Sequence, residues 1–193
     1  MKKIFLIVLI AGAMISGVQA QSSFSLQYSM GFGGTTNNFI TSTSFRGFTM
    51  EYKKFIGPEV SIGFDGGWNI FYERKPYDTY TKGATSLSGI QYRYGHAIPL
   101  FITTTYYFTP GEKLNPFLGV GVGTIYASRD LDMGIFTTNE DAWHFGVKPE
   151  LGVLVSANPD MDILLALRYN HGFATSNVET QSYLTFNLGF VWK

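Results

Sequence analysis

The chain ends with a run of alternating side chains, Ser182-Tyr183-Leu184-Thr185-Phe186-Asn187-Leu188-Gly189-Phe190-Val191-Trp192-Lys193. Large apolar residues occupy every second position from Leu184 to Trp192, and Thr, Asn, Gly and Val stand between them. Because a β-strand sends successive side chains to opposite faces, this run predicts a strand with one face of large apolar groups and one of small or polar groups. Such a strand can turn its apolar face toward a protein core or toward lipid.

The same alternation recurs in seven earlier segments, so the sequence predicts eight strands. Several of the other faces carry charged side chains, which are costly in the dry interior of a soluble protein. A closed barrel with apolar side chains toward lipid and polar ones in the lumen suits both faces. The predicted strands are residues 24–34, 45–55, 59–72, 94–108, 116–128, 142–155, 162–171 and 182–193.

Short and long connections alternate between these segments. The short connections contain Gly, Pro, Asn or Asp, whose backbone preferences suit tight turns. Outer-membrane barrels have short periplasmic turns and longer outside loops, and an even strand count places both termini in the periplasm. The predicted short turns are 56–58, 109–115 and 156–160, and the predicted long loops are 35–44, 73–93, 129–141 and 172–181.

The composition also separates the chain from most soluble domains. Aromatic residues make up 17% and charged residues 15%, whereas a soluble domain carries about 25% charged residues. Beyond the apolar run near the start of the chain, no apolar segment is long enough for a membrane helix, which excludes a helical membrane protein. The alternative is a soluble, secreted lipocalin-like binder with the same strands turned the other way. Aromatic residues predicted to form girdles at the lipid interfaces are Tyr28, Tyr52, Tyr72, Tyr106, Tyr169, Trp68, Trp143 and Trp192.

The first residues have the pattern of an export signal. Lys2 and Lys3 precede an apolar run over 4–13, and Val18-Gln19-Ala20 forms a small-x-small cleavage site. We expect residues 1–20 to be a signal peptide cleaved after Ala20, which leaves a single domain over 21–193. The chain has no cysteine, which excludes a lipid anchor at a cysteine and disulfides. Its balance of 14 basic and 14 acidic residues offers no electrostatic case for nucleic acid.

Three segments carry a resemblance to a known family: Pro116-Phe117-Leu118-Gly119-Val120-Gly121-Val122-Gly123, Leu167-Arg168-Tyr169-Asn170-His171-Gly172 and the final strand. In these segments the chain resembles the small, OmpA/OmpX-like outer-membrane β-barrels of bacteria and the generic outer-membrane β-barrel domain of Bacteroidota type. Two features depart from the usual pattern. The terminal Phe of the insertion signal is replaced by Trp192-Lys193, and Pro149 removes a ladder donor, for which we expect a bulge.

The resemblance implies an all-β fold, an eight-stranded antiparallel up-and-down transmembrane β-barrel in the cell outer membrane. It implies contact with outer-membrane lipid and lipopolysaccharide, insertion by the barrel-assembly machinery, a monomer, no nucleic acid and no cofactor. The expected function is non-enzymatic: envelope integrity, or surface contacts through four extracellular loops. The alternatives are a narrow OmpW-like transporter for small apolar solutes and a lipid A-modifying barrel enzyme.

Charged side chains on the predicted lumen faces are the main candidates for chemistry. An eight-stranded barrel is just wide enough for side chains, and an unpaired buried charge costs several kcal/mol. We therefore expect these charges to pair into a plug, with an ion or proton path as the alternative. The predicted inward charges are Glu51, Lys53, Asp65, Lys148, Glu150, Asp162 and Arg168, with His144 beside them.

No catalytic, cofactor-binding or metal-binding residue is predicted. Gly119, Gly121 and Gly123 lack dinucleotide-loop spacing, so we interpret them as room for bulky lumen neighbours. The three histidines, His96, His144 and His171, lack metal-ligand spacing. His171, Ser176 and Glu179 lie close in sequence, but Phe173 replaces the Ser that lipid A deacylase barrels carry two positions after the His. His171 is predicted to be a polar residue near the outer rim.

We expect the membrane-extracted protein to show heat-modifiable migration on a gel. A folded barrel resists cold detergent because its backbone hydrogen bonds are closed into a ring, and it therefore moves differently from the boiled chain. Identical migration before and after boiling would contradict the barrel. Recovery of the mature chain from the periplasm would favour the lipocalin-like alternative.

Overall fold

The computed structural model describes residues 21–33, 40–82, 85–134, 136–175 and 178–193. The predicted signal peptide, 1–20, lies outside these residues, as does the predicted end of the first strand at Gly34. In the described part of the chain, no helix is long and apolar enough to cross a membrane.

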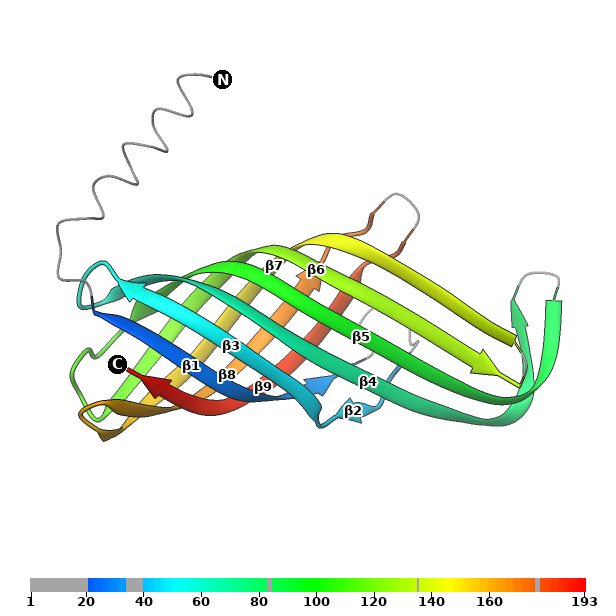
Figure 1. Cartoon of the computed structure of the whole chain (residues 1–193), viewed down its shortest axis with the longest axis horizontal. Helices are drawn as coiled ribbons and strands as arrows, with labels where there is room; N and C mark the ends of the chain where they lie inside the picture. Colours follow the sequence, from blue (N-terminus) through cyan, green and yellow to red (C-terminus); the bar gives the residue numbers. More distant parts are fainter. Residues whose placement is uncertain (1–20, 34–39, 83–84, 135, 176–177) are drawn as a thin grey trace, which may run out of the picture.

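Eight long strands and one two-residue strand form a single antiparallel sheet that closes on itself (Figure 1). The sheet closes where β1 pairs with β9, from Phe24 opposite Trp192 to Phe32 opposite Leu184. The prediction of an eight-stranded up-and-down barrel is confirmed. The strands are β1 (Ser22–Phe32), β2 (Thr43–Ser44), β3 (Arg46–Phe55), β4 (Val60–Lys82), β5 (Thr85–Tyr107), β6 (Leu114–Met133), β7 (Phe136–Asn158), β8 (Met161–Gly172) and β9 (Gln181–Trp192).

Around the middle of the ring, many polar strand residues are buried and many large apolar ones are exposed. On β1, Ser25 and Gln27 are buried inside the barrel, whereas Leu26 between them is 43% exposed. A soluble protein buries its apolar face instead, and contiguous apolar surface of this extent marks contact with another apolar phase. All eight aromatic residues predicted for the girdles lie on the outward face: Tyr28, Tyr52, Tyr72, Tyr106, Tyr169, Trp68, Trp143 and Trp192.

Two predicted long loops are wrong, because the strands continue through them. Strands β4 and β5 extend through 73–93 to Lys82 and Thr85, and β6 and β7 extend through 129–141 to Met133 and Phe136. Thr and Ser on the first hairpin hydrogen-bond across the strands, at 2.7 Å between Thr79 Oγ1 and Ser88 Oγ. Polar residues predominate on both faces of these extensions, and the few apolar ones, such as Leu87 and Met133, do not sustain a period of two over the length of a strand, which is the pattern that predicts a strand.

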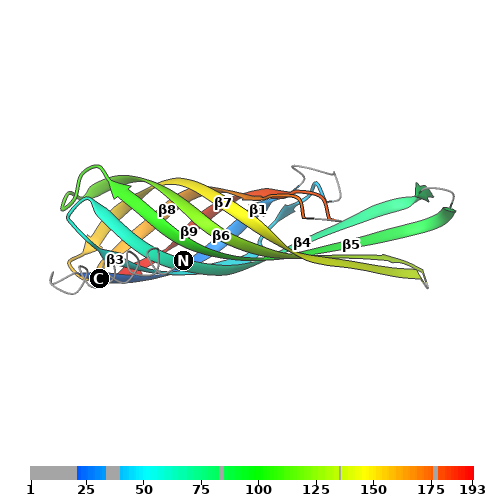
Figure 2. The ribbon, with the colours of Figure 1, turned by 90° about the horizontal axis from the view of Figure 1, so that it is seen from above.

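The extensions give the barrel two different ends (Figure 2). At one end lie the short turns, the start of β1 and the C-terminus; we call this the turn end. At the opposite end β4–β5 and β6–β7 project beyond the other strands; we call this the hairpin end.

The bulge predicted at Pro149 is also wrong. In the register between β7 and β8, Val147 pairs with His171 and Glu150 pairs with Arg168, so no residue is inserted between them. The ladder to β8 omits Lys148 and Pro149, while Pro149 still pairs with Val120 on the other side. The missing amide hydrogen of Pro149 is thus accommodated by leaving Lys148 and Pro149 out of the ladder to β8.

We expect spin labels at Leu165 and Phe186 to be accessible to oxygen dissolved in lipid, because both positions face outward in the ring. A label at Arg168, which is 2% exposed and faces the lumen, serves as the matched control and should be shielded. Electron paramagnetic resonance of the protein in vesicles measures this accessibility. The reverse pattern would show that the apolar face points inward.

Candidate functional site

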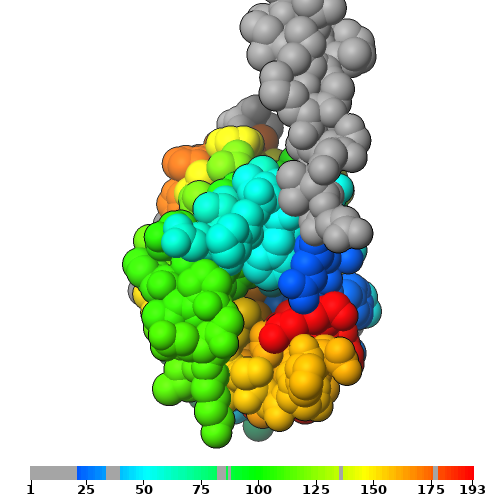
Figure 3. Space-filling view, turned by 90° about the vertical axis from the view of Figure 1, so that its left-hand side faces the viewer, coloured from blue at the N-terminus to red at the C-terminus, as the bar shows by residue number. Residues whose placement is uncertain are grey.

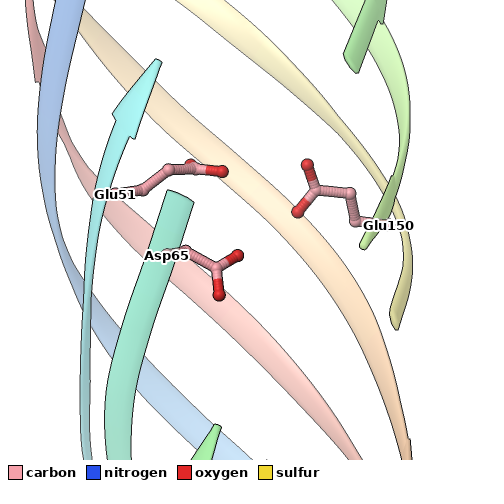
Figure 4. A group of neighbouring side chains, drawn as sticks. All are labelled: Glu51, Asp65 and Glu150. Carbon is pink, nitrogen blue, oxygen red and sulfur yellow. The ribbon is translucent and has the colours of Figure 1, made fainter. Parts of the chain in front are cut away.

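A cluster of charged side chains fills the middle of the lumen. Its members come from two pairs of neighbouring strands, β3 with β4 and β7 with β8, which lie across the ring from each other. All of the members are at least 95% buried. Figure 4 shows three carboxylates of the cluster pointing toward one another from β3, β4 and β7. The charge cluster consists of Glu51 and Lys53 on β3, Asp65 on β4, Lys148 and Glu150 on β7, and Arg168 on β8.

Glu150 lies at the centre of this cluster. Its Oε2 is 2.9 Å from Nε of Arg168 and 3.3 Å from Nζ of Lys148, and its Oε1 is 3.5 Å from Nζ of Lys53. Glu51 pairs with Lys53 at 3.1 Å and with Arg168 at 3.2 Å.

Asp65 completes the cluster by pairing with Lys148. The cluster therefore holds three carboxylates and three cations, and each member has an opposite charge in contact. Such pairing meets the condition under which ionised groups can remain charged in a low-dielectric interior. It confirms the predicted plug of paired charges for these six residues.

Glu51, Asp65 and Glu150 also offer carboxylate oxygens within 4.8 Å of one another, which is close enough for a shared metal ion. A divalent ion there would stand beside the ammonium and guanidinium groups that already neutralise these oxygens. Like charges at such distances repel strongly in a low-dielectric site. We therefore interpret the cluster as an ion-pair network, which the residues present fit better than a metal centre.

Two apolar layers enclose the charge cluster. The first lies toward the turn end, where Phe55 also packs against it, and the second lies toward the hairpin end. The side chains of both layers are at most 7% exposed, and they lie on either side of the ion pairs along the lumen axis. The turn-end layer is Tyr107, Phe117, Leu154, Leu164, Ala166 and Val191, and the hairpin-end layer is Ile40, Phe71, Ala97, Phe101, Ile125 and Tyr183.

An open cavity of about 670 Å³ lies at the turn end. Its lining includes Tyr107 and Leu154 of the turn-end layer and Phe55, which packs against that layer. Figure 3 looks onto this end of the barrel. The predicted inward charge Asp162 lies here and pairs with Lys193 Nζ at 2.8 Å, separately from the charge cluster. A smaller space of about 20 Å³ is lined by Asp162 and Lys193 at the turn end and by Glu51 and Lys53 of the charge cluster.

Ile40 and Thr41, which lie in the predicted loop 35–44, contact the hairpin end of the barrel. Ile40 inserts into the hairpin-end layer, and Glu73 accepts hydrogen bonds from Thr41 N at 2.6 Å and Thr41 Oγ1 at 3.1 Å. Lys75 Nζ lies 2.6 Å from the same carboxylate. Burial acts to raise the pKa of Glu73, but the hydrogen bonds from Lys75 and Thr41 outweigh it, so the pKa lies below its ordinary value. The carboxylate thus stays ionised and holds the segment at neutral pH.

The glycines of β6 provide the room that the sequence predicted. A Cβ at Gly119 would lie 2.5 Å from Oε1 of Glu150, and one at Gly121 would lie 3.1 Å from Cε of Lys148. The side chains of the charge cluster therefore occupy the volume above this strand. The interpretation as lumen space is confirmed for Gly119 and Gly121, whereas a Cβ at Gly123 would clash with the backbone oxygen of Leu100 on β5.

The histidines lie apart from the charge cluster. His144 is buried and its Nδ1 donates to the carbonyl of Phe173 at 2.9 Å. His96 accepts a hydrogen bond from Trp68 Nε1 at 3.4 Å on the outward face. His171 lies half-buried on that face, as predicted for a rim residue.

A His–Ser contact that sequence spacing missed joins His171 Nδ1 to Ser182 Oγ at 2.7 Å. The two residues lie eleven apart and meet because the register of β8 and β9 places them opposite each other. Ser182 is buried, and Phe173 packs edge-on against the His171 ring at 4.7 Å. We interpret the contact as packing at the rim. Ser176 of the sequence-based hypothesis lies outside the described residues.

We expect Arg168→Leu to destabilise the barrel by about 3–5 kcal/mol, because it leaves Glu150 and Glu51 short of a buried partner. Urea unfolding in vesicles measures this loss. The matched control is Lys193→Met, which breaks a single pair with Asp162 beside the open turn-end cavity, where water can replace the ammonium, and should cost about 1 kcal/mol.

A compensated variant, Arg168→Gln with Glu150→Gln, should recover part of the loss because the remaining charges balance. Equal effects of Arg168→Leu and Lys193→Met would contradict the buried network.

Comparison with known proteins shows a likeness in structure. No protein-family model and no curated protein matches this sequence. The chain is similar to the crystal structure of Neisserial surface protein A (NspA), with a TM-score of 0.58 and 15% identity over 91% of this chain and 99% of that one. It is also similar to Ail, the attachment invasion locus protein of Yersinia pestis, with a TM-score of 0.57 and 10% identity over the same shares.

The same Yersinia pestis protein in complex with the heparin analogue sucrose octasulfate gives a TM-score of 0.54 and 12% identity over 91% of this chain and 99% of that one. At these identities the likeness shows the fold. The chain therefore has the fold of small outer-membrane β-barrel proteins.

Proposed function

From the fold that the chain shares with small outer-membrane β-barrels, we propose that it is an integral outer-membrane protein without an open pore. Its turn end faces the periplasm and its hairpin end faces outward, after cleavage of residues 1–20. It acts without catalysis, through surface contacts made by the projecting hairpins and through support of the envelope. Lipid and lipopolysaccharide surround it, and the barrel-assembly machinery inserts it as a monomer.

The filled lumen is the observation that carries this proposal. A water-filled path would have to pass both apolar layers and the charge cluster, whose members are bound to one another. Eight strands enclose a space that side chains fill. The lumen therefore supports a structural or surface role over diffusion of solutes.

A narrow transporter for apolar solutes fits this interior less well. Such a transporter needs an apolar lumen and a lateral opening between strands. Here the middle of the lumen is ionic, and the closing ladder between β1 and β9 runs from Phe24 to Phe32 on β1. The continuous ladder supports a wall without a lateral gate.

The projecting hairpins supply the surface for contact. They carry exposed side chains of the kinds that make adaptable contacts, including Tyr77, which is 72% exposed, and Thr79, Thr81 and Ser86. The names of the similar proteins refer to the cell surface and to attachment. These observations support a role in contacts outside the cell.

We expect the folded protein in planar bilayers to give no stable conductance steps, because the lumen is filled along its axis. Heat-modifiable migration of protein recovered from the same membranes serves as the control for insertion. Reproducible steps from inserted protein would contradict the closed barrel and favour transport.

We expect replacement of residues 77–88 by an Asn-Gly turn to leave the barrel heat-modifiable, since the removed pairs join β4 and β5 only in the hairpin that projects beyond the closed ring. Cells that display this shortened chain should lose attachment to protein-coated surfaces but keep the detergent resistance of cells with the intact chain. Attachment equal to that of the intact chain would contradict a contact role for this hairpin.

A further inference from the structure

We propose that the outward face of β3 and β4 near the hairpin end binds the phosphate groups of an outer-leaflet lipid through Arg46 and Arg74. This inference rests on the proposed membrane position of the barrel, and it adds a defined binding surface to it. The partner is a phosphorylated amphiphile, such as lipopolysaccharide, held with its headgroup at the rim and its acyl chains along the barrel wall.

The two arginines lie on the lipid-facing side of the wall. Strand alternation places Arg46 on the same face as Phe48 and Met50, and Arg74 on the same face as Tyr72. Both arginines are exposed. Within the residues that the structure describes, neither guanidinium takes part in a hydrogen bond or ion pair, which contrasts with the fully paired lumen cations. Their donors are therefore available to an external anion.

Their height along the barrel matches that of a lipid headgroup. Arg46 lies opposite Ile70, and Arg74 lies four residues further along β4, roughly 13 Å at the rise of a strand. Around them Trp68, Tyr72 and Tyr94 form an outward aromatic band, with the rings of Tyr72 and Tyr94 5.1 Å apart. Such bands mark the interface between acyl chains and headgroups. A guanidinium in or just beyond the band lies at the same depth in the membrane as the lipid phosphates and can bind them.

The opposite side of the wall at this end has the reverse charge. Asp130 and Asp132 on β6 and Asp141 on β7 share the outward face with Tyr126 and Trp143. Tyr126 donates to Asp141 at 3.3 Å. Anionic headgroups are repelled from this sector and attracted to the β3–β4 sector, so the charge distribution selects one side of the barrel.

A lipid fits this surface better than free phosphate does. Directly below the arginines, toward the middle of the barrel, lie exposed apolar side chains, including Phe48, Met50 and Phe64. A phosphorylated lipid satisfies both the guanidinium groups and this apolar wall, since planar guanidinium forks bind phosphate oxygens in pairs. Inorganic phosphate can use only the arginines.

The test uses the folded full chain in zwitterionic detergent micelles, titrated with purified lipopolysaccharide. The readout is the temperature at which the folded gel band is lost, because a ligand of the folded state raises it. In the double variant Arg46→Gln with Arg74→Gln, we expect the lipopolysaccharide concentration for a half-maximal shift to rise about tenfold to thirtyfold. The matched control is Lys54→Gln, an outward cation at the other end of β3, which should stay within about twofold.

Three outcomes would overturn the inference: the same titration curve for the double variant and the native chain, an equal shift with inorganic phosphate alone, or loss of the native response when EDTA removes bridging divalent ions. Failure of the proposed function is distinguishable. In that case the native chain shows no heat-modifiable form and does not float with lipid vesicles. That result would remove the membrane premise, and the lipid site with it.

Discussion

Closure of the hydrogen-bonded ring is the constraint on which the rest of the structure depends. In lipid, each unpaired backbone amide or carbonyl costs several kcal/mol, so a sheet can cross only if it has no edge there. The antiparallel ladder between β1 and β9 removes that edge. Once the ring closes, alternate side chains of each strand point outward and into the lumen; the outward set is mostly apolar, and the lumen holds the charged cluster between two apolar layers.

Enclosure explains the charge cluster. Six charged side chains that would be solvated on separate strands are brought within contact distance in a narrow lumen, where only mutual pairing keeps them ionised. The apolar layers on both sides lower the local dielectric and strengthen these pairs. The same side chains occupy the middle of the lumen, so the groups that neutralise one another also fill that space.

Outside the ring, the wall is chemically uneven, and this unevenness separates the two ends. At the turn end the strands are joined by short turns around an open cavity. At the hairpin end β4 to β7 continue as polar sheet, with arginines on one side and aspartates on the other.

The sequence by itself determined the eight strands of the ring and the two faces of each strand, because large apolar residues recur with a period of two, as from Leu184 to Trp192. The closed ring decided that the apolar face points outward. The sequence also indicated that Glu51, Lys53, Asp65, Lys148, Glu150 and Arg168 would pair. The polar hairpin extensions over 73–93 and 129–141 escaped prediction, because Thr, Ser and Tyr with water on both faces leave no apolar period. Only the tertiary structure decided which side chains are partners. Lys148 forms an ion pair with Asp65, Arg168 forms one with Glu150, and His171 forms a hydrogen bond with Ser182. Those contacts depend on register and on the curvature of the closed sheet, which bring together residues that sequence spacing keeps apart.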